Sequence, residues 1–226
     1  MLYKNKAVFV DIDGTLSFTS NIKSAARIFF RAGDKDVVKT QQLFAGLVNR
    51  VSADIVQQSW EFFEPKLDDI GCKLFTAPMG SICITSPRPE ATAALHLLRQ
   101  NFGSVFALTS GEYNFQFSVL KTNKMLGYFD EILTPTSDFP KELFSGFSNY
   151  FLIDDKSPCS VNVKEKLKFL GVDDVPNSSM YASKDLTHFN RLTFLQVEEY
   201  TQDHVLEKLQ LSANFAESIV NMIAIG

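Results

Sequence analysis

Short apolar segments alternate with helical patterns along much of this chain. Apolar runs at 104–108, 131–133 and 150–153 are separated by segments whose apolar residues recur at helical spacing, and a further run, 7–10, lies near the start. Strands of this kind, short, apolar and joined by helices, are typical of a parallel sheet that is buried on both faces. The pattern therefore predicts an α/β fold built on a doubly wound parallel sheet.

The same periodicity places the other elements. We predict helices over 91–100, 115–126, 141–147, 161–170, 202–211 and 215–225, and further strands over 179–182 and 192–197. The polar stretch 17–20 leads into a helical pattern, and amphipathic helices are expected between 37 and 63. Glycines, prolines and a β-branched run follow before the α/β pattern resumes. We therefore expect a core domain of residues 1–16 and 88–226, and an inserted helical domain over 17–87.

Composition excludes several functions. The 226 residues carry a formal net charge of −4, which offers no overall attraction to nucleic acid or to an anionic membrane surface. No apolar stretch approaches the roughly 20 residues of a membrane-spanning helix. Three scattered cysteines and three scattered histidines give no zinc pattern, and an odd cysteine count favours a reducing compartment. Because the chain enters a strand almost at once, leaving no room for a signal peptide, we expect a cytoplasmic protein.

The first strand ends in two carboxylates. Asp11 and Asp13 follow the run 7–10, and Gly14 and Thr15 come next. Because side chains alternate along a strand, Asp11 and Asp13 project in the same direction, and glycine allows a tight turn. One carboxylate can attack while the other moves protons. The alternative is an acidic turn that caps the first helix.

A second strand end carries hydroxyl groups. Thr109, Ser110 and Gly111 follow the run 104–108, and a glycine here lets backbone amides face an anion. Functional residues of doubly wound sheets gather at the carboxyl ends of the strands. The pattern is therefore consistent with phosphate binding, although a helix N-terminus prefers the same residue types.

A third strand end carries adjacent acids, Asp154 and Asp155, after the run 150–153. Neighbouring carboxylates repel each other unless a cation joins them, and Mg²⁺ is the usual cation at oxygen-only sites that also hold a phosphate. We therefore expect Mg²⁺ as the cofactor. The alternative is that the two carboxylates cap the helix that follows.

These segments resemble the haloacid-dehalogenase-like hydrolase superfamily. Its first motif reads Asp-x-Asp-x-Thr, and residues 11–16 match it at every defined position. Its second motif is a Thr or Ser, with which Thr109 aligns, and its fourth is an acidic pair at the position of residues 154–155. The resemblance covers most of 1–16 and 88–175. It implies a Rossmann-like core with a helical cap over 17–87 that selects the substrate.

The resemblance also implies a phosphatase mechanism. Asp11 would attack phosphorus to form an aspartyl-phosphate, and Asp13 would protonate the leaving oxygen and then activate water. Mg²⁺ would be bound by the Asp11 carboxylate, the Asp13 backbone carbonyl and Asp155, with Asp154 assigned to the same metal. Haloacid dehalogenases of the superfamily lack the second aspartate, so Asp13 argues against dehalogenation.

The implied substrate is a small phosphomonoester, such as a sugar phosphate, a phosphoglycolate-like acid or a nucleotide. Its phosphate group would lie against Gly14, Thr15, Ser110 and Gly111, with Thr109 holding the oxygens of the transferring group. Nucleic acid and membranes are not expected as partners.

The third motif of the superfamily is a lysine that neutralises the phosphate. Lys141, which precedes the acidic pair, fits this position best, while Lys121, Lys124 and Lys156 compete with it. Arg88 lies in a segment that resembles the Arg-Pro-Gly segment before the second motif of many members. We consider two roles for it, a substrate contact and a surface ion pair.

Other functions stay open. A phosphomutase or phosphotransferase would pass the phosphoryl group to another hydroxyl, and no residue separates it from a phosphatase. A non-catalytic binding protein could retain the fold, but the intact motifs argue against lost catalysis. The run Asp-Asp-Lys-Ser-Pro at 154–158 also resembles carboxy-terminal-domain phosphatases. The long insertion at 17–87 counts against that last relation.

Overall fold

The computed structural model describes residues 3–21, 68, 71–78, 82–137, 146–172, 186–189, 191–206 and 215–225. Its elements, in chain order, are β1 (Tyr3–Val10), β2 (Ser17–Asn21), β3 (Lys73–Thr76), β4 (Ile82–Pro87), α4 (Ala91–Asn101), β5 (Phe102–Leu108), α5 (Tyr113–Thr122), the 3-10 helix η1 (Leu126–Tyr128), β6 (Glu131–Leu133), β7 (Asn149–Asp154), α7 (Val161–Phe169), β8 (Leu186–Phe189), β9 (Leu192–Gln196), α8 (Gln202–Leu206) and α9 (Phe215–Ile225).

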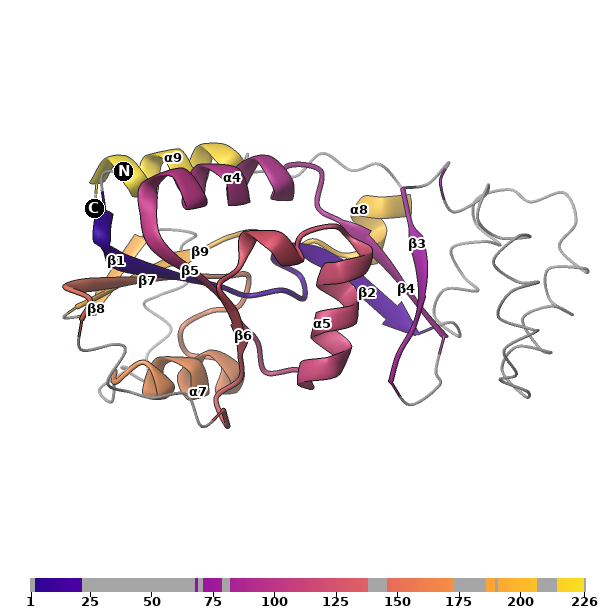
Figure 1. Ribbon diagram of the computed structural model, residues 1–226, viewed down its shortest axis with the longest axis horizontal. Helices are drawn as coiled ribbons and strands as arrows, with labels where there is room; N and C mark the ends of the chain where they lie inside the picture. Colours follow the sequence, from indigo (N-terminus) through magenta and orange to yellow (C-terminus); the bar gives the residue numbers. More distant parts are fainter. Residues whose placement is uncertain are drawn as a thin grey trace, which may run out of the picture.

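A six-stranded sheet forms the centre of the fold (Figure 1), with the strand order β6-β5-β1-β7-β9-β8. All neighbouring strands are parallel except β8, which runs antiparallel to β9. This arrangement confirms the predicted α/β fold with a mostly parallel sheet. Since β1 lies between β5 and β7, the strand order reverses at β1, and a crevice at the carboxyl ends of these strands is expected.

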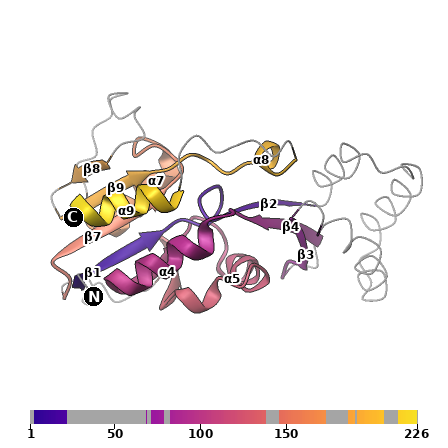
Figure 2. The same ribbon diagram turned by 90° about the horizontal axis from the view of Figure 1, so that it is seen from above.

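Helices cover both faces of this sheet. In Figures 1 and 2, α4 and α9 lie on one face and α7 lies on the other. Alternate side chains of β1 enter the two cores: Val8 and Val10 pack on one side, and Ala7 and Phe9 on the other. A strand buried on both faces explains the continuous apolar run that precedes the first acidic motif. Among the described helices, none is both long and apolar enough to cross a membrane.

A second, antiparallel sheet has the order β2-β4-β3. Figure 2 shows it on the side of the core toward which β1 points. Residues 17–21 pair with 83–87, and 73–76 pair with 82–85, so the edges of the expected helical domain are strands. The polar stretch 17–20, expected only to lead into a helix, forms β2 together with Asn21, because its backbone pairs with the β-branched strand β4. Residues 22–67 lie outside the described residues, and a helical cap over them stays a prediction.

Most other predicted elements are confirmed to within a few residues. They are the helices over 91–100, 115–126, 161–170 and 215–225 and the strands over 104–108, 131–133, 150–153 and 192–197. Residues 186–189 add the edge strand β8, which the sequence pattern did not predict. The strand predicted over 179–182 lies outside the described residues. So does the predicted helix over 141–147, apart from 146 and 147, which are not helical.

Candidate active site at the carboxyl ends of the central strands

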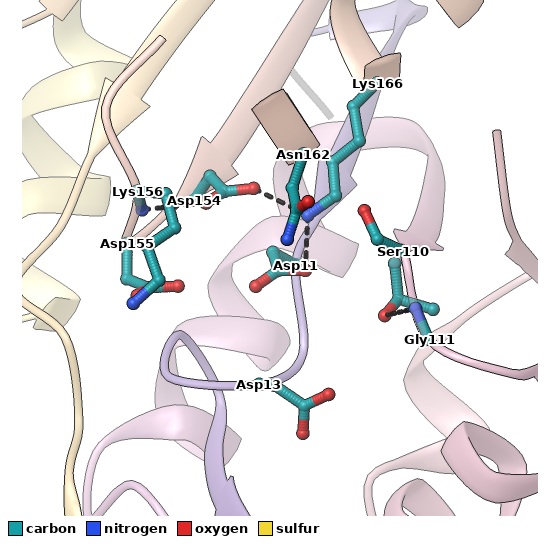
Figure 3. A pocket seen from close by; sticks show the side chains of 10 residues that line it. Asp11, Asp13, Ser110, Gly111, Asp154, Asp155, Lys156, Asn162 and Lys166 are labelled. Carbon is teal, nitrogen blue, oxygen red and sulfur yellow. Dashed lines mark hydrogen bonds and ion pairs between the residues drawn. The ribbon is translucent and has the colours of Figure 1, made fainter. Parts of the chain in front are cut away.

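A pocket of about 280 Å³ opens where β1, β5 and β7 end. Backbone pairing brings the strand ends together, since Val10 is in register with Ile153 and the Asp11 amide donates to the Ile153 carbonyl at 2.9 Å. Figure 3 shows the lining side chains. We call the buried ones the floor, Asp11, Thr109, Asp154, Asp155 and Lys166, and the exposed or half-buried ones the rim, Asp13, Ser110, Gly111, Lys156 and Asn162.

Lys166 reaches the floor from α7, the helix on the face of the sheet opposite α4 and α9. It lies on α7, and its Nζ is 2.5 Å from Asp11 Oδ1 and 2.7 Å from Asp154 Oδ2 (Figure 3). Burial opposes a positive charge here, but the Asp11 and Asp154 carboxylates outweigh that effect and raise the pKa of Lys166. Lys166 is therefore a permanently charged bridge between two strand ends.

The floor nevertheless holds more negative charge than Lys166 compensates. Burial raises the pKa of Asp11 well above its ordinary value, and the neighbouring Asp154 adds to the shift, which Lys166 offsets only in part. Burial also raises the pKa of Asp155, against a hydrogen bond from Lys156. With Asp11, Asp154 and Asp155 ionised, the floor holds three carboxylates and one ammonium group, which leaves an excess of two negative charges. That excess matches one divalent cation.

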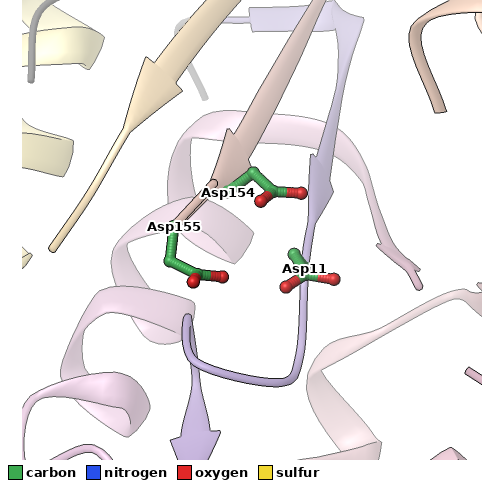
Figure 4. A group of neighbouring side chains, drawn as sticks. All are labelled: Asp11, Asp154 and Asp155. Carbon is green, nitrogen blue, oxygen red and sulfur yellow. The ribbon is translucent and has the colours of Figure 1, made fainter. Parts of the chain in front are cut away.

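The donor atoms also fit such a cation. Asp11, Asp154 and Asp155 each offer one carboxylate oxygen, and these three atoms lie within 4.8 Å of one another (Figure 4). The Thr15 hydroxyl lies 3.3 Å from Asp11 Oδ2 and 3.2 Å from Asp155 Oδ1, so these two oxygens face the same point. Oxygen-only carboxylate sets of this kind suit Mg²⁺.

The three carboxylates are not equivalent as ligands. Both oxygens of Asp154 already accept hydrogen bonds, Oδ1 from the Lys156 backbone amide at 2.8 Å and Oδ2 from Lys166. The partner of Asp11 Oδ2 and Asp155 Oδ1 is one hydroxyl, which carries a single proton. Asp11 and Asp155 could therefore hold a cation directly, whereas both oxygens of Asp154 already accept hydrogen bonds from lysines.

The turn after β1 is built around Gly14. Its φ of 81° lies in the left-handed region that favours glycine, and a Cβ at this position would lie 2.8 Å from Asp155 Oδ2. The Gly14 carbonyl accepts a hydrogen bond from the Tyr200 amide at 2.6 Å, which ties the turn to the segment after β9. Gly14 thus supports the floor by leaving room for Asp155.

Asp13 has surroundings unlike those of Asp11. Its side chain is exposed on the rim, and Gln116 Nε2 donates to Asp13 Oδ2 at 2.5 Å. Partial loss of hydration raises the pKa of Asp13, and hydrogen bonds from Gln116 and Thr19 oppose the shift. A raised pKa suits a carboxyl group that must both give and take a proton.

The loop after β5 presents its hydroxyls to the pocket. Thr109 is buried, its amide donates to the Leu133 carbonyl at 3.0 Å, and its hydroxyl accepts from the Gly111 amide at 3.1 Å. Capping of α5 falls instead to Glu112, whose carboxylate accepts from two backbone amides of the first turn. The helix-cap alternative for Thr109 is therefore not what the structure has.

The structure thus brings together the predicted residues of three strand ends. Asp11, Asp13, Thr109, Ser110, Gly111, Asp154 and Asp155 line one pocket, and Gly14 and Thr15 lie directly behind it. Lys141, the predicted third-motif lysine, lies outside the described residues.

Arg88 does not reach the pocket and is not on the surface. It is 2% exposed, its guanidinium donates to the Glu198 carbonyl at 2.5 Å, and it lies over the Phe215 ring at 4.7 Å. Both expected roles, a substrate contact and a surface ion pair, are therefore wrong for this geometry. Because the segment after β9 and α9 pack against this position, Arg88 holds the end of the chain to the core.

Three side chains at the site were missed by the motif analysis. Lys166 and Asn162 are one turn apart on α7, after the acidic pair, whereas the expected lysine precedes it. A signal was present, because Lys166 lies between Val163 and Leu167 on the apolar side of its helix. Gln116, the partner of Asp13, has no comparable signal.

The fold and site together define an α/β protein with an acidic, cation-compatible centre. No protein-family model and no curated protein matches this chain. It is similar to two solved structures of the RNA polymerase II CTD phosphatase Fcp1. One has 17% identity over 68% of this chain and 38% of that one, at a TM-score of 0.42. The other, a fission yeast variant bound to beryllium fluoride, has 13% identity over 98% and 51%, at 0.47.

The chain therefore spans well under two thirds of the length of either Fcp1 structure. It is also similar to the HAD-hydrolase YfnB from Bacillus subtilis bound to magnesium, with 14% identity over 79% of this chain and 91% of that one, at a TM-score of 0.40. Solved structures from the superfamily that the motifs resemble are thus among those similar to this chain.

Proposed function

We propose that this protein is a Mg²⁺-dependent phosphatase that hydrolyses a small phosphomonoester through an aspartyl-phosphate on Asp11. One observation carries the proposal: two carboxylates of one turn face one pocket in different environments, Asp11 fixed on the floor by Lys166 and Asp13 exposed on the rim. A fixed nucleophile beside an accessible acid and base is what two-step phosphoryl transfer requires.

Asp11 and Asp155 would hold the ion, and Asp154 would keep its place behind them. When bound, Mg²⁺ would supply positive charge that offsets the repulsion between the carboxylates and the phosphate and stabilises the charge of the transition state. The excess of two negative charges and the converging oxygens of Asp11 and Asp155 support this assignment.

In the first half-reaction the Asp11 carboxylate attacks phosphorus, and the bond to the ester oxygen breaks. Lys166 keeps the nucleophile oriented, while Thr109 and Ser110 contact the oxygens of the transferring group. Asp13 delivers its proton to the departing alcohol oxygen, so that a neutral alcohol leaves. The product of this step is an aspartyl-phosphate.

In the second half-reaction Asp13, now ionised, removes a proton from water. The water oxygen attacks phosphorus, inorganic phosphate leaves, and the Asp11 carboxylate is restored. Asp13 regains its proton in this step, so both groups return to their starting states after one turnover.

The pocket favours a small substrate. Its volume of about 280 Å³ holds a phosphate group and a compact alcohol. Lys156 and Asn162 on the rim are placed to contact the part of the substrate beyond the phosphate. The net charge of −4 gives no attraction to larger polyanions, which favours a small substrate over a nucleic acid.

The test is a panel of phosphorylated sugars, acids and nucleotides, assayed with Mg²⁺ and with a chelator. We expect phosphate release by the wild type with Mg²⁺ only, and none by Asp11→Asn. Asp130→Asn is the matched control, since this aspartate makes a surface ion pair with Arg99 and does not line the pocket. Equal activity of wild type and Asp11→Asn on every ester would contradict the proposal.

A further inference from the structure

We infer that Gln116 is a positioning residue that holds the Asp13 carboxylate in place for proton transfer. The inference rests on the proposed function, since it concerns how Asp13 reaches the leaving oxygen. Gln116 does not line the pocket itself, so it would act through Asp13 alone.

The contact between the two side chains is short and directional. Gln116 Nε2 donates to Asp13 Oδ2 at 2.5 Å. Gln116 is 1% exposed, whereas Asp13 is exposed on the rim. A buried side chain therefore holds one carboxylate oxygen of an exposed side chain.

The start of α5 aims the Gln116 amide. The Glu112 carboxylate accepts hydrogen bonds from the backbone amides of Asn114 and Phe115. The Glu112 backbone carbonyl accepts a hydrogen bond from the backbone amide of Gln116 at 3.0 Å. These contacts place Gln116 on the first turn of the helix with its side chain directed at the turn after β1. The hydrogen bonds at the start of α5 thus set the direction of the Gln116 side chain.

Gly111 leaves the space that this arrangement needs. A Cβ at position 111 would lie 2.3 Å from Gln116 Nε2, closer than any real contact. The loop that carries the predicted phosphate-binding residues therefore runs directly against the Gln116 amide. A side chain at 111 would displace that amide from Asp13.

The side-chain amide of Gln116 also lowers the stability of the folded protein. Gln116 Oε1 is buried and accepts no hydrogen bond from the described residues. Burying an acceptor without a partner lowers stability, and an apolar side chain of the same length would avoid that cost. Packing therefore does not explain a glutamine here, whereas its N–H donor toward Asp13 does.

The inference predicts a dependence on the leaving group. A basic leaving oxygen needs the proton from Asp13, while a weakly basic one departs largely without it. Loss of the Gln116 contact should therefore slow hydrolysis of phenyl phosphate far more than that of para-nitrophenyl phosphate. A merely structural defect would slow both equally.

The experiment measures kcat/KM of Gln116→Met with both aryl phosphates in the presence of Mg²⁺. We expect a loss of about 10- to 100-fold with phenyl phosphate and about 3-fold or less with para-nitrophenyl phosphate. Gln116→Asn, which keeps the amide but is too short to reach Asp13, should show the same selectivity and guards against a folding defect in the first variant. Gln100→Met, on the surface of α4, is the control and should match wild type.

The same variant in an Asp13→Asn background separates positioning from structure. If Gln116 acts through Asp13, Gln116→Met should cause no further loss there. Equal losses with both esters, or a full further loss in the Asp13→Asn background, would overturn the inference while leaving the phosphatase proposal intact. Wild type that is inactive on both esters and on the metabolite panel would instead remove the proposed function, and this inference with it.

Discussion

The floor and the rim of the pocket handle charge in opposite ways. On the floor, Asp11 and Asp154 are buried and share Lys166 at 2.5 and 2.7 Å. On the rim, Asp13 is exposed and its hydrogen bonds come from neutral groups, Gln116 and Thr19, while the charge of Lys166 has a smaller effect on it. Ion pairing fixes the floor carboxylates in one place, while a neutral partner leaves Asp13 free to change its protonation state. The three-residue segment 11–13 thus places two carboxylates in two different chemical environments.

The largest expected effect on activity comes from removing one carboxylate from the floor and, separately, one from the rim. We expect Asp11→Asn to lower kcat by about 10⁴-fold or more, the scale seen when a covalent nucleophile is lost. Asp13→Asn should lose about 10²- to 10⁴-fold, and less with good leaving groups, because only proton transfer is affected. Steady-state assays of both variants with the two aryl phosphates check this. Equal losses that do not depend on the leaving group would remove the distinction between floor and rim.

The two lysines of the pocket should contribute differently to the stability of the folded protein. Lys166→Met leaves two buried carboxylates without their cation and should lower the free energy of unfolding by about 3 kcal/mol. Lys156 is 44% exposed and pairs with Asp155 and Glu199, so Lys156→Met should cost about 1 kcal/mol or less. Urea unfolding in the presence of a chelator measures both. A similar cost for the two variants would show that burial does not matter here.

Metal binding should stabilise the floor. At a Mg²⁺ concentration 100 times Kd, a single site adds about 2.7 kcal/mol to the free energy of unfolding. We expect the melting temperature of wild type to rise with Mg²⁺ and that of Asp155→Asn to stay unchanged. The control is Asp130→Asn, which should respond like wild type. A rise in Asp155→Asn equal to that in wild type would place the ion elsewhere.

The smallest effect is on pH dependence. Because burial raises the pKa of Asp155, the folded metal-free protein binds this proton more tightly than the unfolded chain does. Stability is therefore lost as pH rises through the folded pKa, and the loss is absent in Asp155→Asn. In chelator, the variant should be more stable than wild type at neutral pH, and its advantage should shrink as pH falls toward the ordinary aspartate value. An advantage that does not vary with pH would count against this sign.

The strand-end residues were predictable because their information is local. A buried strand followed by acids or hydroxyls fixes both direction and location, and parallel pairing then brings Asp11, Thr109 and Asp155 together. The exact register between strands is not needed for this prediction, because each of these residues directly follows its own strand in the sequence.

The helix residues were not predictable in the same way. Whether Lys166 reaches Asp11 depends on which face of α7 packs under the sheet, and a lysine beside Val163 and Leu167 is visible only once that face is known. Arg88 was misassigned because its partners, Glu198 and Phe215, lie more than a hundred residues later. Contacts of this separation leave no local pattern.

The most direct test of the proposed mechanism is to find the phosphoryl group on the protein. Wild type mixed with Mg²⁺ and a substrate from the panel is quenched in acid during turnover, digested and analysed by mass spectrometry. We expect a phosphorylated peptide that contains Asp11, with the phosphoryl group on that side chain, and no such peptide from Asp11→Asn. A phosphoryl group on another residue, or turnover by Asp11→Asn at the wild-type rate, would contradict it.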